Sequence, residues 1–318
     1  MKKHSPASKN KFYDCVGIGL CVSDYQCILD HYPEPDMKTE LKKFVHQGGA
    51  PVPTAMVALG KWKHDIAFIG ITGDDYDGNY IRREMESFGV DTSHMVIDRK
   101  SRTCRSFIWI DESRGTRAVV LDKTEARPLP SRVATPAALP HCRILHTDGR
   151  ETPVALKAMR LTQKRGGTVV IDAGSPRDHM DDLFAATDHF VASHAFVRKY
   201  YGRMIKPETA IKRFLQKGPG TAIITLAEKG CIGATKDGGF FRVKGYSKPG
   251  FVVDTTGAGD VFHGGYIHGL LRGWSPEESA RYANAAAFLS CNGPGARDSI
   301  PSLNKVTRLL KDENSLNS

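Results

Sequence analysis

The chain has 318 residues, of which 40% are hydrophobic, so it can bury a sizeable core in one large domain or two ordinary ones. Its formal net charge is +10, but beyond the basic first eleven residues the charge is spread, which argues against a nucleic-acid footprint. The seven cysteines form no Cys-x-x-Cys pair, which argues against zinc and predicts reduced thiols, and no apolar stretch reaches the roughly 18 residues of a membrane span. We therefore expect a cytoplasmic protein that binds neither nucleic acid nor membranes.

The first predicted element is a buried strand at residues 13–20, after a basic and flexible tail at residues 1–11. Four shorter strands are predicted at 25–29, 41–46, 103–111 and 116–121. The last two carry apolar groups on both faces, which is typical of a sheet that packs beyond its own domain. An edge hairpin of the main sheet is the alternative interpretation.

The rest of the chain alternates regularly between strands and helices. Strands are predicted at 67–71, 143–147, 168–172, 190–192 and 222–226, helices at 77–88, 153–164, 178–186, 207–217, 261–271 and from 276 toward 291, and a hairpin at 231–235 with 240–243. This alternation predicts a mostly parallel sheet with helices on both faces, and ligands at the carboxyl ends of its strands. We expect this domain to cover residues 12–312, followed by a short tail at 313–318.

The most informative stretch is residues 254–260, which reads Asp-Thr-Thr-Gly-Ala-Gly-Asp before a predicted helix. A glycine-rich turn that opens a helix leaves unpaired N–H groups at the positive end of the helix dipole, which favours an anion. Gly257 and Gly259 allow close approach of phosphate oxygens to the backbone. Asp260 is then placed to take the proton of a hydroxyl that attacks a phosphoryl group. A capped turn without catalysis is the alternative, but two acids flanking the turn favour the catalytic interpretation.

These residues resemble the signature of the PfkB, or ribokinase-like, family of sugar and nucleoside kinases. The resemblance covers nearly the whole chain, with further matches at residues 17–24, 48–55, 73–78 and 283–301. It implies a doubly wound α/β fold and a small β-sheet lid, formed by about 25–46 and 103–121, that often mediates a homodimer. It also implies ATP-dependent phosphorylation of a sugar hydroxyl, with Asp260 as the general base and the turn of Gly257, Ala258 and Gly259 as the anion hole.

The same resemblance implies two binding sites. Asp24 and the Gly48-Gly49 turn are expected to hold the sugar, although Asp24 at a strand end is also typical of a turn cap. Thr54 stands where the family often has Asn. The nucleotide is expected at Thr225, Ala227, Glu228, Gly230 and Asn284, where Ala227 replaces a glycine that is usual in the family.

Magnesium is expected with ATP, because the phosphates need charge neutralisation during transfer. The Asn-x-x-Glu motif that orders magnesium in the family is replaced here by residues 193–196, Ser-His-Ala-Phe, so no magnesium ligand is assigned. The resemblance also implies a monovalent cation site, suited to K⁺, at Asp254, Thr256, Ser290, Gly293, Gly295 and Ser299.

Two cations bear on the substrate. Lys38 and Arg150, together with residues 48–55 and 260–264, resemble sulfofructose kinases, where basic residues receive a sulfonate, so an acidic sugar is predicted. A solvated Lys38, and an Arg150 that pairs with Asp148 or Glu151, are the alternatives. A nucleoside kinase of the same family and a ligand-binding pseudokinase are the alternative functions.

Overall fold

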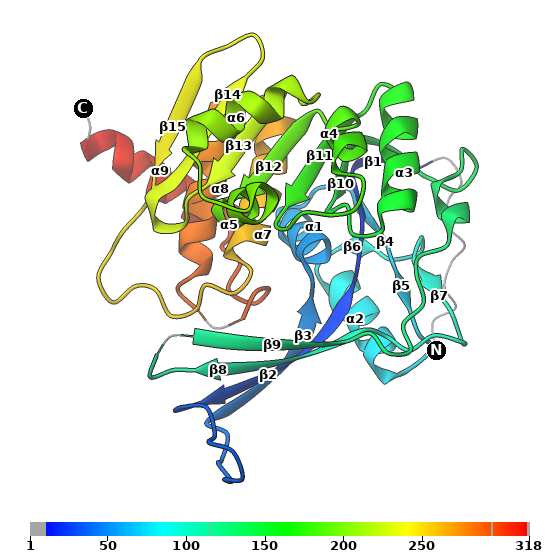
Figure 1. Ribbon diagram of the computed structural model, residues 1–318, viewed down its shortest axis with the longest axis vertical. Helices are drawn as coiled ribbons and strands as arrows, with labels where there is room; N and C mark the ends of the chain where they lie inside the picture. Colours follow the sequence, from blue (N-terminus) through cyan, green and yellow to red (C-terminus); the bar gives the residue numbers. More distant parts are fainter. Residues whose placement is uncertain (1–10, 115, 294, 317–318) are drawn as a thin grey trace.

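The computed structural model describes residues 11–114, 116–293 and 295–316, and side chains as far as residue 312. Within these residues nine strands form the main sheet: β1 (Phe12–Ile18), β4 (Ile66–Ile69), β6 (Val90–Asp91), β10 (His141–Thr147), β11 (Thr168–Ala173), β12 (His189–Ser193), β13 (Thr221–Thr225), β14 (Gly230–Thr235) and β15 (Phe240–Lys244). Their order is β15-β14-β13-β12-β11-β10-β1-β4-β6 (Figure 1). The pairs from β13 to β6 are parallel, and β14 and β15 add an antiparallel edge.

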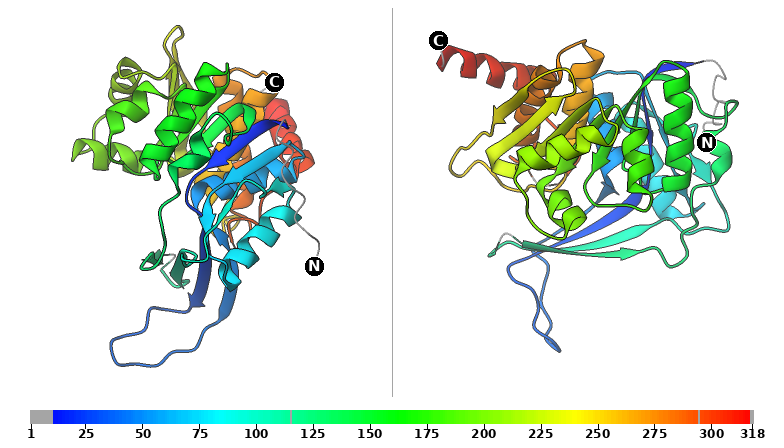
Figure 2. Two further views of the ribbon diagram at one scale, coloured as in Figure 1. Left: turned by 90° about the vertical axis from the view of Figure 1, so that its right-hand side faces the viewer. Right: turned by 45° about the horizontal axis from the view of Figure 1, so that its top comes forward.

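Side chains of the central strands alternate between two cores, because successive strand residues point to opposite faces. Val170 and Val191 pack in one core, whereas Val169 and Phe190 pack in the other. The first core is closed by α1 (Pro51–Lys61), α2 (Tyr76–Ser87), α7 (Ala258–Leu271), α8 (Pro276–Ser290) and α9 (Leu303–Leu316). The second is closed by α3 (Thr152–Lys164), α4 (Met180–Ala185), α5 (His194–Tyr201) and α6 (Pro207–Gln216) (Figure 2). The predicted doubly wound α/β architecture is confirmed.

A second, four-stranded sheet lies across the end of the main sheet where β1 leads into it (Figure 1). It consists of β2 (Val22–Leu29), β3 (Lys43–Gly49), β8 (Arg105–Asp111) and β9 (Thr116–Asp122), in the order β3-β2-β8-β9. The predicted separate sheet is therefore confirmed, and the edge-hairpin alternative is wrong. We refer to this sheet as the lid.

Several predicted boundaries differ from the structure. The strand predicted at 67–71 ends at Ile69, and residues after Gly70 form the short strand β5 (Ile71–Thr72), which pairs with β7 (Val96–Ile97). Helix α5 was not predicted because it has only eight residues, and α9 extends to Leu316, into the stretch predicted as a tail. The predicted tail at residues 1–11 lies, apart from Lys11, outside the described residues.

Ser275 and Glu278 form a capping box at the start of α8, the helix predicted from residue 276. The seven cysteines are free thiols and six of them are buried, as expected for reduced cysteines. Among the described residues, no helix has the length and apolar character needed to cross a bilayer.

The strand order places a crevice between β1 and β10. The chain proceeds from β1 outward to β4 on one side, and returns through β10 to β13 on the other. In open α/β sheets, ligands bind outside the carboxyl ends of the strands at this point of reversal. The lid lies next to that edge, so the crevice is where a site is expected.

Candidate active site

The glycine-rich turn opens α7 and leaves its N-terminus free for an anion. Gly257 precedes the helix with φ 75°, and a Cβ there would lie 2.4 Å from the Cβ of Ala296, so this position requires glycine. A Cβ on Gly259 would meet no atom within 4 Å, so the turn faces open space. Backbone N–H groups and the helix dipole both favour a phosphate at such a helix start.

Asp260 lies in the first turn of α7, beside this open space. Desolvation raises the pKa of its carboxyl to about 7, and the nearby Asp172 adds to the rise, while His263, Arg117 and Arg297 oppose it. A carboxylate with a pKa near neutrality is well matched to accepting a proton at physiological pH.

Behind Asp260, a buried contact between a histidine and a carboxylate joins α7 to the end of β11. Nε2 of His263 lies 3.3 Å from Oδ1 of Asp172, and the ring of His146 is 5.4 Å from that of His263. Burial lowers the pKa of His146 to about 4, so this histidine is neutral at physiological pH. The pair fixes the first turns of α7 against the sheet.

Asp24 lies on β2 at the mouth of the crevice, and its carboxylate accepts a hydrogen bond of 2.6 Å from Oγ of Ser106. Desolvation raises its pKa to about 6. A Cβ on Gly49 would lie 1.9 Å from Oδ2 of Asp24, so the backbone of the Gly48-Gly49 segment passes directly against this carboxylate. The structure thus brings together the three residues predicted to hold the sugar.

Gly48 and Gly49 are the last residues of strand β3 rather than a separate turn, and a largely buried ion pair that was not predicted holds them. Glu84 on α2 accepts a hydrogen bond of 2.8 Å from the Gly48 N–H and pairs with Nη1 of Arg297. Nη2 of Arg297 donates to the Gly49 carbonyl at 3.2 Å, and the arginine side chain is fully buried. The closing segment of the chain therefore positions the Gly48-Gly49 segment near its beginning.

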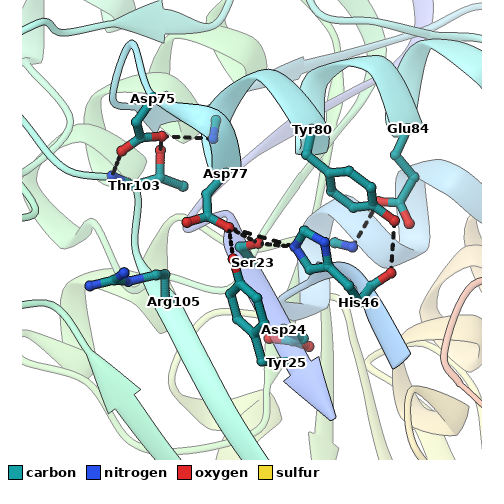
Figure 3. A network of polar contacts seen from close by, with 12 residues as sticks. Ser23, Asp24, Tyr25, His46, Asp75, Asp77, Tyr80, Glu84, Thr103 and Arg105 are labelled. Carbon is teal, nitrogen blue, oxygen red and sulfur yellow. Dashed lines mark hydrogen bonds and ion pairs between the residues drawn. The ribbon is translucent and has the colours of Figure 1, made fainter. Parts of the chain in front are cut away.

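A polar network anchors the lid on α2 beside Asp24 (Figure 3). Asp77 accepts hydrogen bonds from Oγ of Ser23 at 2.6 Å and from the Tyr25 hydroxyl at 2.7 Å. The His46 ring stacks between Tyr25 and Tyr80, with centroids 4.5 and 4.0 Å away. Because strands β2 and β3 are fixed at this end, Asp24 has a defined place over the crevice.

Arg150 lies at the carboxyl end of β10, where its Nε is 3.6 Å from Oδ2 of the buried Asp148. A second arginine, Arg177, donates to the Asp148 carbonyl at 3.4 Å. Lys38 is exposed in the loop between β2 and β3, which extends away from the body of the molecule (Figure 1). The prediction that Lys38 and Arg150 face one end of a ligand is not met within this chain, because that loop does not pack on the crevice; Arg177 is the second cation there.

A cavity of about 790 Å³ lies on the other side of the anion turn. All five residues predicted to bind the nucleotide line it: Thr225, Ala227, Glu228, Gly230 and Asn284. Ala258 and Gly259 line the same cavity, so it is continuous with the open helix N-terminus. Ala227, which replaces the family's glycine, adopts φ 53°, a left-handed conformation that favours glycine.

The predicted cation ligands lie mostly in one place. Asp254 accepts hydrogen bonds from the N–H groups of Thr256 at 2.8 Å and Gly295 at 3.0 Å, and the Ser299 hydroxyl donates to the Gly295 carbonyl at 2.6 Å. A Cβ on Gly293 would lie 3.2 Å from the Cβ of Ser299, so Gly293 belongs to the same group.

Ser290, the sixth predicted cation ligand, bonds within its own helix, and residues 193–196, which replace the magnesium motif, cap and pack helix α5. The Ser290 hydroxyl donates to the Ala287 carbonyl within its own helix at 2.8 Å. Ser193 caps α5, and Phe196, which stands at the position of the family's Glu, is buried in the core. Among the described residues, no cluster of three or more His, Cys, Asp and Glu is placed to hold a metal ion.

Gly259→Val is expected to lower kcat while the protein keeps its fold. The added side chain enters open space at the helix N-terminus, so it clashes with no protein atom and instead occupies the place of the phosphoryl group. Steady-state kinetics and circular dichroism test this. Gly239→Val is the control, because that glycine also faces open space but lies in the distant β14–β15 hairpin. Equal kinetics of both variants and wild type would place the phosphate elsewhere.

A helix that opens at an unfilled space, an acid beside it and a cavity behind it are the features expected of a sugar or nucleoside kinase. The chain belongs to the PfkB family of carbohydrate kinases, which it matches over residues 14–303. It is 25% identical to a ribokinase of Haemophilus influenzae, over 92% of this chain and 97% of that protein. It is 23% identical to a nucleoside kinase of Methanothermobacter thermautotrophicus, over 93% and 94%. The fold is that of a putative ribokinase II of E. coli solved with ATP and Mg²⁺ (TM-score 0.80, 19% identity, 94% and 99% covered).

Proposed function

We propose that this kinase transfers the γ-phosphoryl group of ATP to a hydroxyl of an anionic sugar derivative. The observation that carries the proposal is Asp260, which has a pKa raised to about 7, directly follows Gly259 of the cavity lining, and feels the same two arginines, Arg117 and Arg297, as Asp24. The sugar hydroxyl gives its proton to Asp260 and attacks the phosphoryl group, whose oxygens are met by the N–H groups of the turn. Asp24 accepts hydrogen bonds from the other sugar hydroxyls.

Magnesium and a monovalent cation are part of this proposal. The E. coli protein of the same fold was solved with ATP and Mg²⁺, which supports magnesium as the partner of the phosphates here. It would neutralise the developing charge, and we assign it no protein ligand. The grouping of Asp254, Gly293, Gly295 and Ser299 supports a K⁺ site behind the turn, because it gathers a carboxylate, a hydroxyl and a carbonyl oxygen, the hard ligands that K⁺ prefers.

The anionic class of substrate follows from the arginines beside β10. Arg150 lies beside the carboxylate of Asp148, and Arg177 donates to the backbone carbonyl of the same residue. Asp148 is buried, and desolvation raises its pKa. Nε of Arg150 makes no hydrogen bond among the described residues. These two guanidinium groups beside Asp148 supply positive charge at the sugar end of the crevice, which suits a carboxylate, phosphate or sulfonate.

Arg150→Ala is expected to raise KM for the acidic substrate about ten- to a hundredfold, because a charged hydrogen bond contributes about 1.5–3 kcal/mol. KM for a neutral sugar such as fructose should stay close to wild type. The measurement is a kinetic panel of neutral, carboxylated, phosphorylated and sulfonated sugars. Arg160→Ala is the matched control, since its exposed ion pair with Asp182 lies on α3, away from the crevice.

The panel also separates this proposal from its alternative. A nucleoside kinase would show its highest kcat/KM with a nucleoside, in line with the Methanothermobacter relative. Highest kcat/KM with neutral sugars, together with no effect of Arg150→Ala on any substrate, would contradict the anionic class and return Arg150 to the role of ion-pair partner of Asp148.

We also propose that the lid forms a homodimer. Among the described residues, six large apolar side chains of the lid strands are exposed to solvent in the single chain: Phe44, Phe107, Trp109, Val119, Val120 and Leu121. Exposed apolar surface of this kind is typical of protein interfaces. The cytoplasmic location stays a prediction from the sequence.

A further inference from the structure

One contact joins the lid directly to the anion turn. Nη1 of Arg117 donates a hydrogen bond of 2.8 Å to Oγ1 of Thr256, across 139 residues of sequence. Arg117 lies on β9, the strand at the edge of the lid, opposite Ile110 of β8. Thr256 immediately precedes Gly257, so the guanidinium group of Arg117 reaches the place where the proposed phosphoryl transfer occurs.

The charge of Arg117 is not balanced by a carboxylate. Among the described residues it forms no ion pair within 4 Å, although it is close enough to lower the pKa of both Asp24 and Asp260. The guanidinium group is therefore near both the acid of the sugar site and the general base, and it contacts the turn that opens α7. A neutral hydroxyl is a weak partner for a guanidinium group, whose planar fork matches phosphate oxygens.

We propose that Arg117 binds the transferring phosphoryl group, as a catalytic residue that the lid supplies to the site. This inference rests on the proposed function. In the reaction, the bond between the γ-phosphorus and the bridging oxygen of ADP breaks, and a bond to the sugar oxygen forms. The sugar proton goes to Asp260, ADP leaves with the electron pair, and Arg117 keeps its protons and stabilises the charge on the phosphoryl oxygens.

The location of this charge has a consequence for the lid. The turn and Asp260 belong to the main domain, whereas Arg117 moves with the lid sheet. The transferring phosphoryl group is then stabilised by the charge of Arg117 only when β9 lies over the turn, as it does in this structure.

The test compares Arg117→Ala and Arg117→Lys with Arg114→Ala, a control on the same hairpin whose arginine is exposed and lies 3.9 Å from Asp111. Arg117→Ala should lower kcat about 10²–10³-fold, as for loss of one donor to a developing oxyanion, with KM for ATP near wild type. Added guanidinium chloride at millimolar concentration should restore part of this turnover, and should restore none in Asp260→Asn. Arg117→Lys should be intermediate, and Arg114→Ala unchanged.

A binding measurement keeps this inference separate from the proposed function. Calorimetry with Mg·ADP, with and without aluminium fluoride as a phosphoryl mimic, should show that Arg117→Ala loses the added affinity for the fluoride complex but binds ADP normally. Wild-type protein that phosphorylates no sugar, yet shows this difference, would refute the proposed function and support the role of Arg117. An Arg117→Ala variant with wild-type kcat, or with unchanged affinity for the fluoride complex, would overturn the role of Arg117.

Discussion

Asp260→Asn is expected to lower kcat by about 10²–10⁴-fold, the usual effect of removing a general base, while ATP still binds. The amide keeps the size and polarity of the carboxylate but cannot accept the proton of the sugar hydroxyl. Steady-state kinetics with the best substrate, and calorimetry with ATP, measure the two effects. Asp237→Asn, in the exposed turn of the β14–β15 hairpin, is the control. Near-wild-type turnover of Asp260→Asn would exclude the assigned role.

The pH dependence of kcat/KM for the wild-type enzyme also tests the role of Asp260 as general base. A base must be deprotonated to act, and desolvation and Asp172 raise the pKa of Asp260 to about 7 against the opposing effects of His263, Arg117 and Arg297. We therefore expect kcat/KM to fall as the pH drops through about 7 and to level off above it. A flat profile between pH 5 and 8 would contradict the assignment, because an unperturbed Asp titrates near 3.9.

Arg297→Ala is expected to lower the free energy of unfolding by about 3–5 kcal/mol, because it leaves a charge without its partner in the protein interior. Arg297 is fully buried, and its removal leaves the carboxylate of Glu84 beside the Gly48 N–H without a cationic partner. It also removes the donor to the Gly49 carbonyl, so affinity for the sugar should fall as well. Denaturant unfolding, with and without the best sugar, measures both effects.

Two variants control for this stability prediction. Arg297→Met combined with Glu84→Gln removes both charges and should cost less than Arg297→Ala alone, since an apolar and neutral pair avoids the stranded charge. Arg308→Ala, on the exposed side of α9, should stay within about 0.5 kcal/mol of wild type. If Arg297→Ala were as stable as Arg308→Ala, the ion pair would have no part in holding the Gly48-Gly49 segment.

The parts of the site that could be predicted from the sequence are those made by local patterns. Residues 254–260 form the helix start that their glycines indicate, and the five nucleotide residues meet in one cavity because each follows a strand or lies on a helix at that edge. The order of strands and helices was predicted for the same reason, since the periodicity of each segment reflects its own burial.

The parts that could not be predicted depend on side chains that meet across long sequence separations. Arg297 and Glu84 are 213 residues apart, and Arg117 and Thr256 are 139 apart, so no spacing in the sequence indicates either pair. The only indication in the sequence that Asp172 belongs to the site is that it is an acid at the end of a predicted strand. Lys38 was assigned to the site by resemblance, whereas its position depends on how a long loop packs.

The contact between Arg297 and Gly49 also bears on how the protein is made. These residues are separated by 248 positions, so at a synthesis rate of 5–20 residues per second Gly49 leaves the ribosome roughly 12–50 s before its partner exists. During that interval the nascent chain carries Glu84 and the Gly48-Gly49 segment without the cation that holds them. The sugar site therefore gains the cation that holds Gly48 and Gly49 only after the segment with Arg297 has been made.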